Sequence, residues 1–179
     1  MKIAFIAPVS SPFLDMVNRE LNNMCKSLFI FHTKPKHRPS WWSNYHLDEN
    51  SQICKKPREV SPGIYLTLEP LKYCIKFKPD VVVVHGSLSP SLWWVTLWAK
   101  YKNIPVILFT EPLGRGDSIF SRSKFFHSRL FRILFKSIYR DLGEILAVGQ
   151  ITEKYFSEDL QFGRAKVSRT QYPVDMSRL

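Results

Sequence analysis

Short runs of consecutive apolar residues recur along the chain, and each run ends at a polar residue or a glycine. The clearest run is Val81–Val84, which is followed by His85, Gly86 and Ser87. Successive residues of a strand point to opposite faces of a sheet, so this strand would be apolar on both faces. That pattern is typical of a parallel sheet with helices on its two sides. The run therefore predicts a central strand.

Similar runs predict strands on both sides of this one, and residues at helical spacing lie between them. Because strands and helices alternate, the pattern predicts an α/β fold with a Rossmann-like, doubly wound parallel sheet and helices on both faces. The length of 179 residues favours one domain spanning 1–179. The predicted strands are Lys2–Pro8, Leu28–Phe31, Ile64–Leu68, Val81–Val84, Ile104–Thr110, Glu144–Val148 and Lys166–Tyr172.

Two of the predicted helices begin with a serine followed by a proline, at Ser11 and at Ser89. Serine is a favoured N-cap residue, and proline fits the first helical position because its missing N–H is not needed there. The helix after Ser89 is apolar around most of its circumference. We therefore expect it in the interior, with its tryptophans packed in the core.

The periodicity disappears from about residue 34 to residue 62. This segment contains several prolines, with Trp41, Trp42 and Tyr45 between basic residues. A loop of this length inside a compact domain is usually functional or partly disordered. We expect an irregular basic and aromatic loop here.

The formal net charge is +11, and aromatic residues make up 14% of the chain. This excess of lysine and arginine indicates an anionic partner, for which nucleic acid, anionic lipid and phosphorylated substrate are the candidates. No apolar run of about 18 residues and no leader-like pattern occurs, so we expect a cytoplasmic protein. Cys25, Cys54 and Cys74 lack CxxC spacing, and we expect reduced cysteines and no metal site.

The predicted helix at about 121–142 carries its basic residues on one side. With Arg129 as zero and 100° per residue, three other basic positions fall within about 20° of one line and Arg132 lies about 60° away. The stripe consists of Arg122, Arg129, Arg132, Lys136 and Arg140, with Phe125 and Tyr139 flanking it and apolar residues on the opposite arc. The stripe is either a membrane-contacting surface or an ordinary solvated helix face.

The order of these segments resembles the amino-terminal half of the GT-B glycosyltransferases, specifically the family-4 group. The segments that carry the resemblance are KIAFIAPV, KPDVVVVHG, IPVILFTEP, EILAVG and the final KVSRTQYPVD, and together they cover nearly the whole chain. In that family two Rossmann-like domains face each other. The first domain holds the acceptor, and the second holds most of the nucleotide-sugar.

The resemblance implies a site in the loops after three strands, at the edge of the sheet where parallel strands end. Where the family usually has two glycines near the donor diphosphate, this sequence has Ser10 and Ser11, whose Cβ atoms block the closest approach. The acceptor-binding residues that the resemblance implies are Gly86, Ser87 and Arg115, and the residues nearest to the reacting sugar are His85 and Glu111.

The two candidates for the reaction centre also have ordinary readings. Glu111 precedes a proline, so it is either a turn or helix-cap residue or a carboxylate that stabilises an oxocarbenium-like state. His85 is either a structural residue at the end of a strand or a contact of the sugar. No nucleophile-elbow pattern is present.

As the resemblance implies, the chain would bind a sugar or a lipid-linked sugar acceptor at an anionic membrane surface, on the inner face of the cytoplasmic membrane. The domain itself would hold no cofactor; a nucleotide-sugar donor would bind a second domain, which is absent from these residues, so the fragment alone would be inactive. The resemblance also implies a retaining transfer and a role in envelope or surface polysaccharide synthesis.

Other functions stay open. The chain would alternatively be a non-catalytic recruiting subunit of a split glycosyltransferase. A basic nucleic-acid-binding domain has only the charge in its favour, because no helix-turn-helix, RNP, KH or zinc pattern occurs. Dinucleotide oxidoreduction is disfavoured because no GxGxxG follows the first strand.

Overall fold

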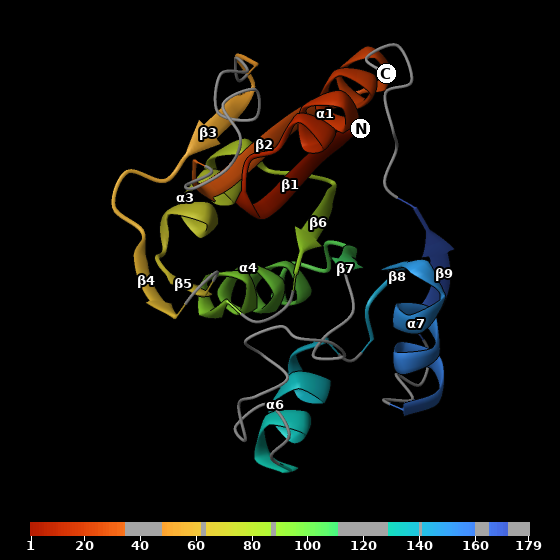
Figure 1. Cartoon of the computed structure of the whole chain (residues 1–179). Helices are drawn as coiled ribbons and strands as arrows, with labels where there is room; N and C mark the ends of the chain where they lie inside the picture. The colour runs from red at the N-terminus through yellow and green to blue at the C-terminus, as the bar shows by residue number, and fades with distance from the viewer. Residues whose placement is uncertain are drawn as a thin grey trace. The chain divides into compact units, whose positions relative to one another are not determined.

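The computed structural model describes residues 1–34, 48–61, 64–86, 89–110, 129–139, 141–159 and 165–171. Its contacts divide the chain into two compact units, Met1–Val106 and Ile107–Gln171. The elements of the first unit are β1 Lys2–Val9, α1 Pro12–Met24, β2 Lys26–Thr33, β3 Ser51–Ile53, β4 Arg58–Ser61, β5 Ile64–Leu66, α3 Glu69–Phe77, β6 Val81–His85 and α4 Pro90–Tyr101 (Figure 1).

Together with β7 Val106–Thr110, β8 Glu144–Val148 and β9 Lys166–Thr170, the strands β1, β2, β3 and β6 form a seven-stranded sheet in the order β3-β2-β1-β6-β7-β8-β9. β1 pairs in parallel with β2 and with β6, and β2 pairs in parallel with β3. The register aligns Ile6 with Ile30 on one side and with Val84 on the other. The prediction of a parallel α/β sheet is confirmed, and so is the central position of β6.

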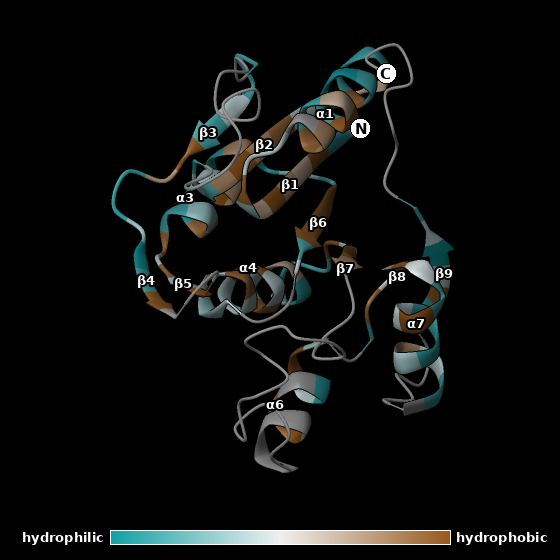
Figure 2. Cartoon of the chain, viewed as in Figure 1, coloured by the Kyte–Doolittle hydropathy of each residue, from teal (hydrophilic) through white to brown (hydrophobic). Residues whose placement is uncertain are grey.

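Helices cover both faces of the sheet in the first unit, as the valine run predicts. Val82, Val83 and Val84 are all buried although they alternate between the faces, and Figure 2 shows β6 as hydrophobic. On β2, Ser27 bonds α1, whereas His32 bonds the first turn of α4 on the opposite face. α4 in turn packs against α3.

The helix that follows β1 starts as the sequence predicts. The Ser11 backbone is extended, and its Oγ accepts a hydrogen bond from Leu14 N at 3.2 Å. Pro12 follows in the first turn. The cap ends β1 sharply, which places Ser10 and Ser11 at the carboxyl edge of the sheet.

Two expectations for this unit are wrong. The irregular segment expected over 34–62 contains two strands: β3 lies at the edge of the sheet, and β4 pairs antiparallel with β5 in a separate two-stranded sheet. Neither strand contains an apolar run, because β3 is Ser-Gln-Ile and β4 is Arg-Glu-Val-Ser. Residues 35–47, which include Trp41, Trp42 and Tyr45, lie outside the described residues.

The helix α4 is not enclosed on all sides. Its inner residues are fully buried, but Leu97 is 48% exposed and Tyr101 is 79% exposed. Its three tryptophans, Trp93, Trp94 and Trp98, are half-buried. Although α4 is apolar on most of its circumference, the described residues bury only one of its faces, and the other face is exposed or half-buried.

The second unit contains β7 Val106–Thr110, α6 Arg129–Tyr139, β8 Glu144–Val148, α7 Gly149–Lys154, a π-helical turn Tyr155–Asp159 and β9 Lys166–Thr170. The first residue of β7 lies one position before the boundary between the two units. β8 pairs in parallel with both β7 and β9. The predicted strands at these positions are confirmed. Of the long helix expected at about 121–142, the structure describes Arg129–Tyr139.

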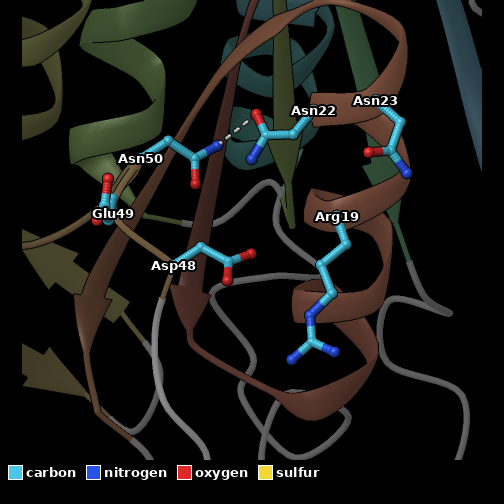
Figure 3. Close-up of a pocket in the computed structure, with 6 residues that line it drawn as sticks. All are labelled: Arg19, Asn22, Asn23, Asp48, Glu49 and Asn50. Atoms are coloured by element: carbon cyan, nitrogen blue, oxygen red, sulfur yellow. Dashed lines mark hydrogen bonds between the residues drawn. The ribbon is translucent and has the colours of Figure 1, made fainter.

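A cluster of amide side chains, here the amide cluster, holds the turn before β3 against α1. Asn18, Asn22 and Asn50 form it together with Ser27 and Asp48, and Figure 3 shows the bond between Asn50 and Asn22. Asn18 is 1% exposed; its Nδ2 donates to Asp48 Oδ2 at 3.1 Å and to Asn50 Oδ1 at 3.0 Å. The Asn50 Nδ2 donates to Asn18 Oδ1 at 2.7 Å.

Replacing Asn18 with alanine should therefore lower the free energy of unfolding by about 1–3 kcal/mol, because the buried Ser27 and the half-buried Asp48 and Asn50 lose their hydrogen bonds to it. Urea unfolding of the whole chain measures this change. Asn23→Ala is the matched control, since Asn23 is exposed on the same helix and should cost under about 0.5 kcal/mol. Equal decreases in the free energy of unfolding in the two variants would show that the amide cluster does not specifically stabilise the contact between α1 and the turn before β3.

Candidate functional site

The carboxyl ends of β1 and β6 lie side by side, and they bring two of the predicted site segments together. The parallel register aligns Ile6 with Val84, so the residues that follow, Pro8 and Gly86, lie at the same level of the edge. Gly86 has φ +79°, and a Cβ added to it would have Pro8 Cγ at 3.8 Å as its nearest atom. The turn after β6 therefore favours glycine for its backbone conformation.

His85 precedes this glycine at the end of β6. The residue is half-buried, its Nδ1 is shut off from solvent, and its ring centroid lies 6.4 Å from that of Phe5. Burial lowers the pKa of His85 to about 4, because the charged imidazolium would lose its hydration. At neutral pH the ring is uncharged, which suits hydrogen bonding and excludes a role as a resident cation.

Ser10 and Ser11 follow β1 at the same edge, but their polar groups serve the fold. Ser10 is 2% exposed and Ser11 is 8% exposed. The Ser10 N–H donates to Thr33 O at 3.4 Å, and the Ser11 hydroxyl caps α1. These bonds explain why serine is suitable here on structural grounds alone. Contact of either residue with a donor diphosphate stays a prediction.

His32 of β2 is a buried residue near this edge that the sequence reasoning missed. Its Nδ1 lies 3.1 Å from Ala7 O, and its Nε2 lies 2.6 Å from Ser91 Oγ in the first turn of α4. The ring stacks on Tyr65 with centroids 5.1 Å apart. The Ser91 Oγ is also 3.1 Å from Tyr65 O. The only signal in the sequence is a histidine that directly follows an apolar run.

The bond partners of His32 determine its tautomer. A carbonyl oxygen only accepts, so Nδ1 carries the proton toward Ala7. The single Ser91 hydroxyl proton is shared between the neutral Nε2 at 2.6 Å and Tyr65 O at 3.1 Å. Burial lowers the pKa of His32 to about 4, although the bond to Ala7 works in the opposite direction. His32 therefore acts as a neutral link between β1, β2 and α4. It thereby fixes the start of α4.

The other predicted site residues lie outside the described side chains. Ser87, Glu111, Arg115, Phe125 and Arg140 are not among the described residues, and for Arg129 and Arg132 only the backbone of α6 is described. Of the predicted site, the structure brings together Ser10, Ser11, His85 and Gly86. The catalytic and acceptor-binding assignments stay predictions.

In the second unit, α6 differs from the sequence expectation in two ways. Tyr139, expected to flank the basic stripe, is fully buried. Ile133 and Leu134, expected on the opposite apolar arc, are 57% and 43% exposed. Lys136 is exposed as expected. The described part of α6 thus presents apolar and basic side chains to the surroundings together.

Within the described ranges, no group of three or more His, Cys, Asp or Glu residues could hold a metal ion. The three cysteines are free, and burial raises the pKa of Cys54 and of Cys74 to about 12. These two thiols are therefore protonated and unreactive at neutral pH. None of the helices in the described part of the chain has the length and apolar composition that a membrane crossing requires.

Comparison with solved structures identifies the fold. The chain resembles the UDP-GlcNAc 2-epimerase from Methanocaldococcus jannaschii, with a TM-score of 0.50 and 18% sequence identity over 93% of this chain. The match covers 45% of the epimerase, so the chain spans less than half of its length. At this identity the likeness shows the fold alone: an α/β domain that resembles one half of a GT-B-like fold.

A second structure, the SurE protein from Aquifex aeolicus, matches with a TM-score of 0.32 and 13% identity, over 75% of this chain and 60% of that one. A score this low carries no argument. No protein-family model and no curated protein matches the sequence. The comparisons confirm the fold part of the predicted resemblance, whereas membership of the family-4 group stays a prediction.

The buried histidines predict a loss of stability in acid. The pKa of His32 is about 4 in the folded chain, whereas its ordinary value is 6.5. Between about pH 4 and pH 6.5, His32 is therefore protonated in the unfolded chain but neutral in the folded chain. The stabilisation is complete above about pH 6.5 and is lost as the pH falls toward 4. For His32 the loss between about pH 7.5 and about pH 5 should be on the order of 2 kcal/mol.

Urea unfolding at the two pH values measures this loss. His32→Gln should lower the free energy of unfolding at both pH values. The difference in this free energy between the two pH values should become smaller by the part that His32 contributes. His85 is the other histidine with a lowered pKa, so His85→Gln should independently reduce the same pH-dependent difference in the free energy of unfolding. A pH dependence that is the same in His32→Gln as in the unsubstituted chain would contradict the proton linkage.

Proposed function

We propose that this chain is the acceptor-side half of a nucleotide-sugar-dependent glycosyltransferase with a GT-B fold. The observation that carries the proposal is the edge where β1 and β6 end side by side, with Gly86 next to Pro8. In open parallel sheets ligands bind at this edge. The absence of a side chain on Gly86 leaves its backbone open to a sugar hydroxyl.

The neighbouring groups suit recognition of a neutral hydroxylated ligand. His85 is uncharged at neutral pH, so it offers hydrogen bonding without a fixed charge. The polar groups of Ser10 and Ser11 are engaged within the fold. This arrangement favours an acceptor sugar over a diphosphate at this half of the site.

The reaction itself needs groups that other segments supply. Glu111 directly follows the carboxyl end of β7, and in the proposal its carboxylate stabilises the positive charge that develops on the transferred sugar. Gly86, Ser87 and Arg115 contact the acceptor. The donor binds a second nucleotide-binding half, which either continues this polypeptide or belongs to a partner chain; in the second case the present chain is a recruiting subunit.

The first test is sugar binding at the proposed edge. The full chain is labelled with ¹⁵N, and glucose, galactose, mannose and N-acetylglucosamine are each added to it up to millimolar concentration. At least one of these sugars should shift the backbone amide NMR signals of residues near Pro8 and Gly86. Gly86→Ala should weaken that binding by about tenfold or more, because the added Cβ strains the turn and occupies the edge.

Gly149→Ala is the matched control, because Gly149 also has a positive φ of +77° but lies in the second unit with nothing within 4 Å of an added Cβ. It should suffer similar strain and leave sugar binding unchanged. Absence of any sugar response, or equal binding by Gly86→Ala, would refute the acceptor site. The chain alone should not turn over UDP-GlcNAc, and tight UDP-GlcNAc binding would place the donor on this half instead.

We further propose that this half contacts an anionic membrane surface through α6. The exposed apolar side chains of Ile133 and Leu134 and the exposed Lys136 support the proposal, because a helix lying on a membrane combines apolar contacts with basic residues. Each basic residue near such a surface contributes about 1 kcal/mol. The stripe formed with Arg129, Arg132 and Arg140, next to Phe125, would add to it.

Co-sedimentation of the full chain with vesicles measures this contact. Binding to vesicles of phosphatidylglycerol and phosphatidylcholine should be strong at low salt, and raising the salt should release the chain. Lys136→Glu with Ile133→Ser should reduce binding, whereas Lys154→Glu with Ile151→Ser is a control pair on α7, where Ile151 is 55% exposed. Equal binding to pure phosphatidylcholine would contradict the electrostatic contact.

A further inference from the structure

The first unit contains a recess that no part of the proposed transfer site uses. It has a volume of about 410 Å³ and is formed where β1 and β2 begin, beneath the last turn of α3. The residues that line it include Lys2, Lys26, Gln52, Tyr73, Lys76 and Phe77. We call it the lysine recess. It lies at the amino ends of the strands, whereas the candidate acceptor site lies at their carboxyl ends.

Three lysines of the recess come from three different elements. Lys2 and Lys26 are register partners on neighbouring parallel strands, and Lys76 is in the last turn of α3. Like charges placed side by side on neighbouring strands destabilise a sheet. Lysine at the carboxyl end of a helix is favourable in itself, so Lys76 has a local explanation. The pairing of Lys2 with Lys26 has none within the fold.

No carboxylate in the described residues lies within ion-pair distance of these three ammonium groups. Two acidic side chains of the first unit, Asp80 and Glu69, accept hydrogen bonds from backbone N–H groups instead. Asp80 Oδ2 accepts from Lys2 N at 2.7 Å, and Glu69 accepts from Lys55 N at 2.9 Å and from Lys56 N at 3.1 Å. The recess therefore concentrates positive charge that no carboxylate among the described residues neutralises.

Aromatic side chains form the other part of the wall. Tyr73 and Phe77 are half-buried on α3, and Leu28 of β2 faces the same recess. The Lys2 ammonium lies 6.0 Å from the centroid of the Phe77 ring, which is the outer range of a cation–π contact. A ligand that enters would meet Lys2 and Lys26 on the strand side, and Lys76 beside the Tyr73 and Phe77 rings on the helix side.

We propose that the lysine recess binds a phosphorylated small molecule. The three ammonium groups hold its phosphoryl group, and Tyr73 and Phe77 pack against its organic part. The volume lies within the range of small-molecule sites, and a few charged groups in a partly apolar wall are typical of such sites. The binding of an anion would also relieve the repulsion between Lys2 and Lys26. The proposal does not rest on the proposed transferase function.

A nucleoside diphosphate and the headgroup of a phospholipid share this chemistry, and the probes distinguish them. Isothermal titration of the full chain at low salt uses ADP, adenosine, inorganic phosphate and soluble dihexanoyl phosphatidic acid. ADP should bind more tightly than inorganic phosphate, and adenosine should not bind measurably. Tighter binding of the phosphatidic acid than of ADP would identify a lipid headgroup as the source of the phosphate.

Two matched double variants locate the binding. Lys26→Gln with Lys76→Gln should weaken binding of the preferred probe by about tenfold or more, since each charge-assisted contact is strong. Lys56→Gln with Lys72→Gln removes the same charge from exposed positions. This control should change the affinity for the preferred probe by less than about twofold. Phe77→Leu should weaken ADP but leave inorganic phosphate unchanged. Thermal unfolding of each variant verifies that it is folded.

Equal weakening by the two double variants would show that the net charge, and not the recess, attracts phosphate, and this result would overturn the proposal. Failure of all the phosphate probes to bind would overturn it as well. Neither outcome affects the acceptor edge, because Gly86→Ala leaves the recess intact and the lysine variants leave the edge intact.

Discussion

The parallel pairing of β1 with β2 and β6 is the interaction on which the first unit depends. Ala4, Ile6 and Val84 are fully buried, and Phe5 stacks on Phe29 with ring centroids 4.9 Å apart. Because both faces of these strands are covered, a slip of the register by one residue would move every side chain to the opposite face and disrupt the packing on both. The register therefore fixes which residues meet at each edge of the sheet.

The two edges have different chemistry as a result. At the carboxyl edge, uncharged groups gather around Gly86, and the buried link from His32 to Ser91 holds the start of α4. At the amino edge, the same register places Lys2 beside Lys26. One pairing pattern thus produces an uncharged edge, for which we propose sugar binding, and a recess lined by lysines, for which we propose phosphate binding. The resemblance to half of a GT-B-like fold concerns the fold alone.

Much of the framework could be predicted because it depends on local patterns. The valine run indicated a strand buried on both faces, and the pairs Ser11-Pro12 and Ser89-Pro90 indicated the starts of α1 and α4. The short strands β3 and β4 could not be predicted, because each contains a single apolar residue and therefore no apolar run. The lysine recess was also beyond the sequence, since Lys2, Lys26 and Lys76 are far apart in the chain and only the register and α3 bring them together. His32 was missed for the same reason: its partners, Ala7 and Ser91, belong to other elements.

Native-state amide hydrogen exchange tests the central claim, which is that β1, β2 and β6 form one buried parallel core. Amides of Phe5, Ile30 and Val83 should exchange only through global unfolding, with equal free energies of exchange, whereas amides of the small β4–β5 sheet should exchange through local opening at lower cost. If the β6 amides exchanged as fast as those of β4, the strand would not be central, and both edges built on its register would be contradicted.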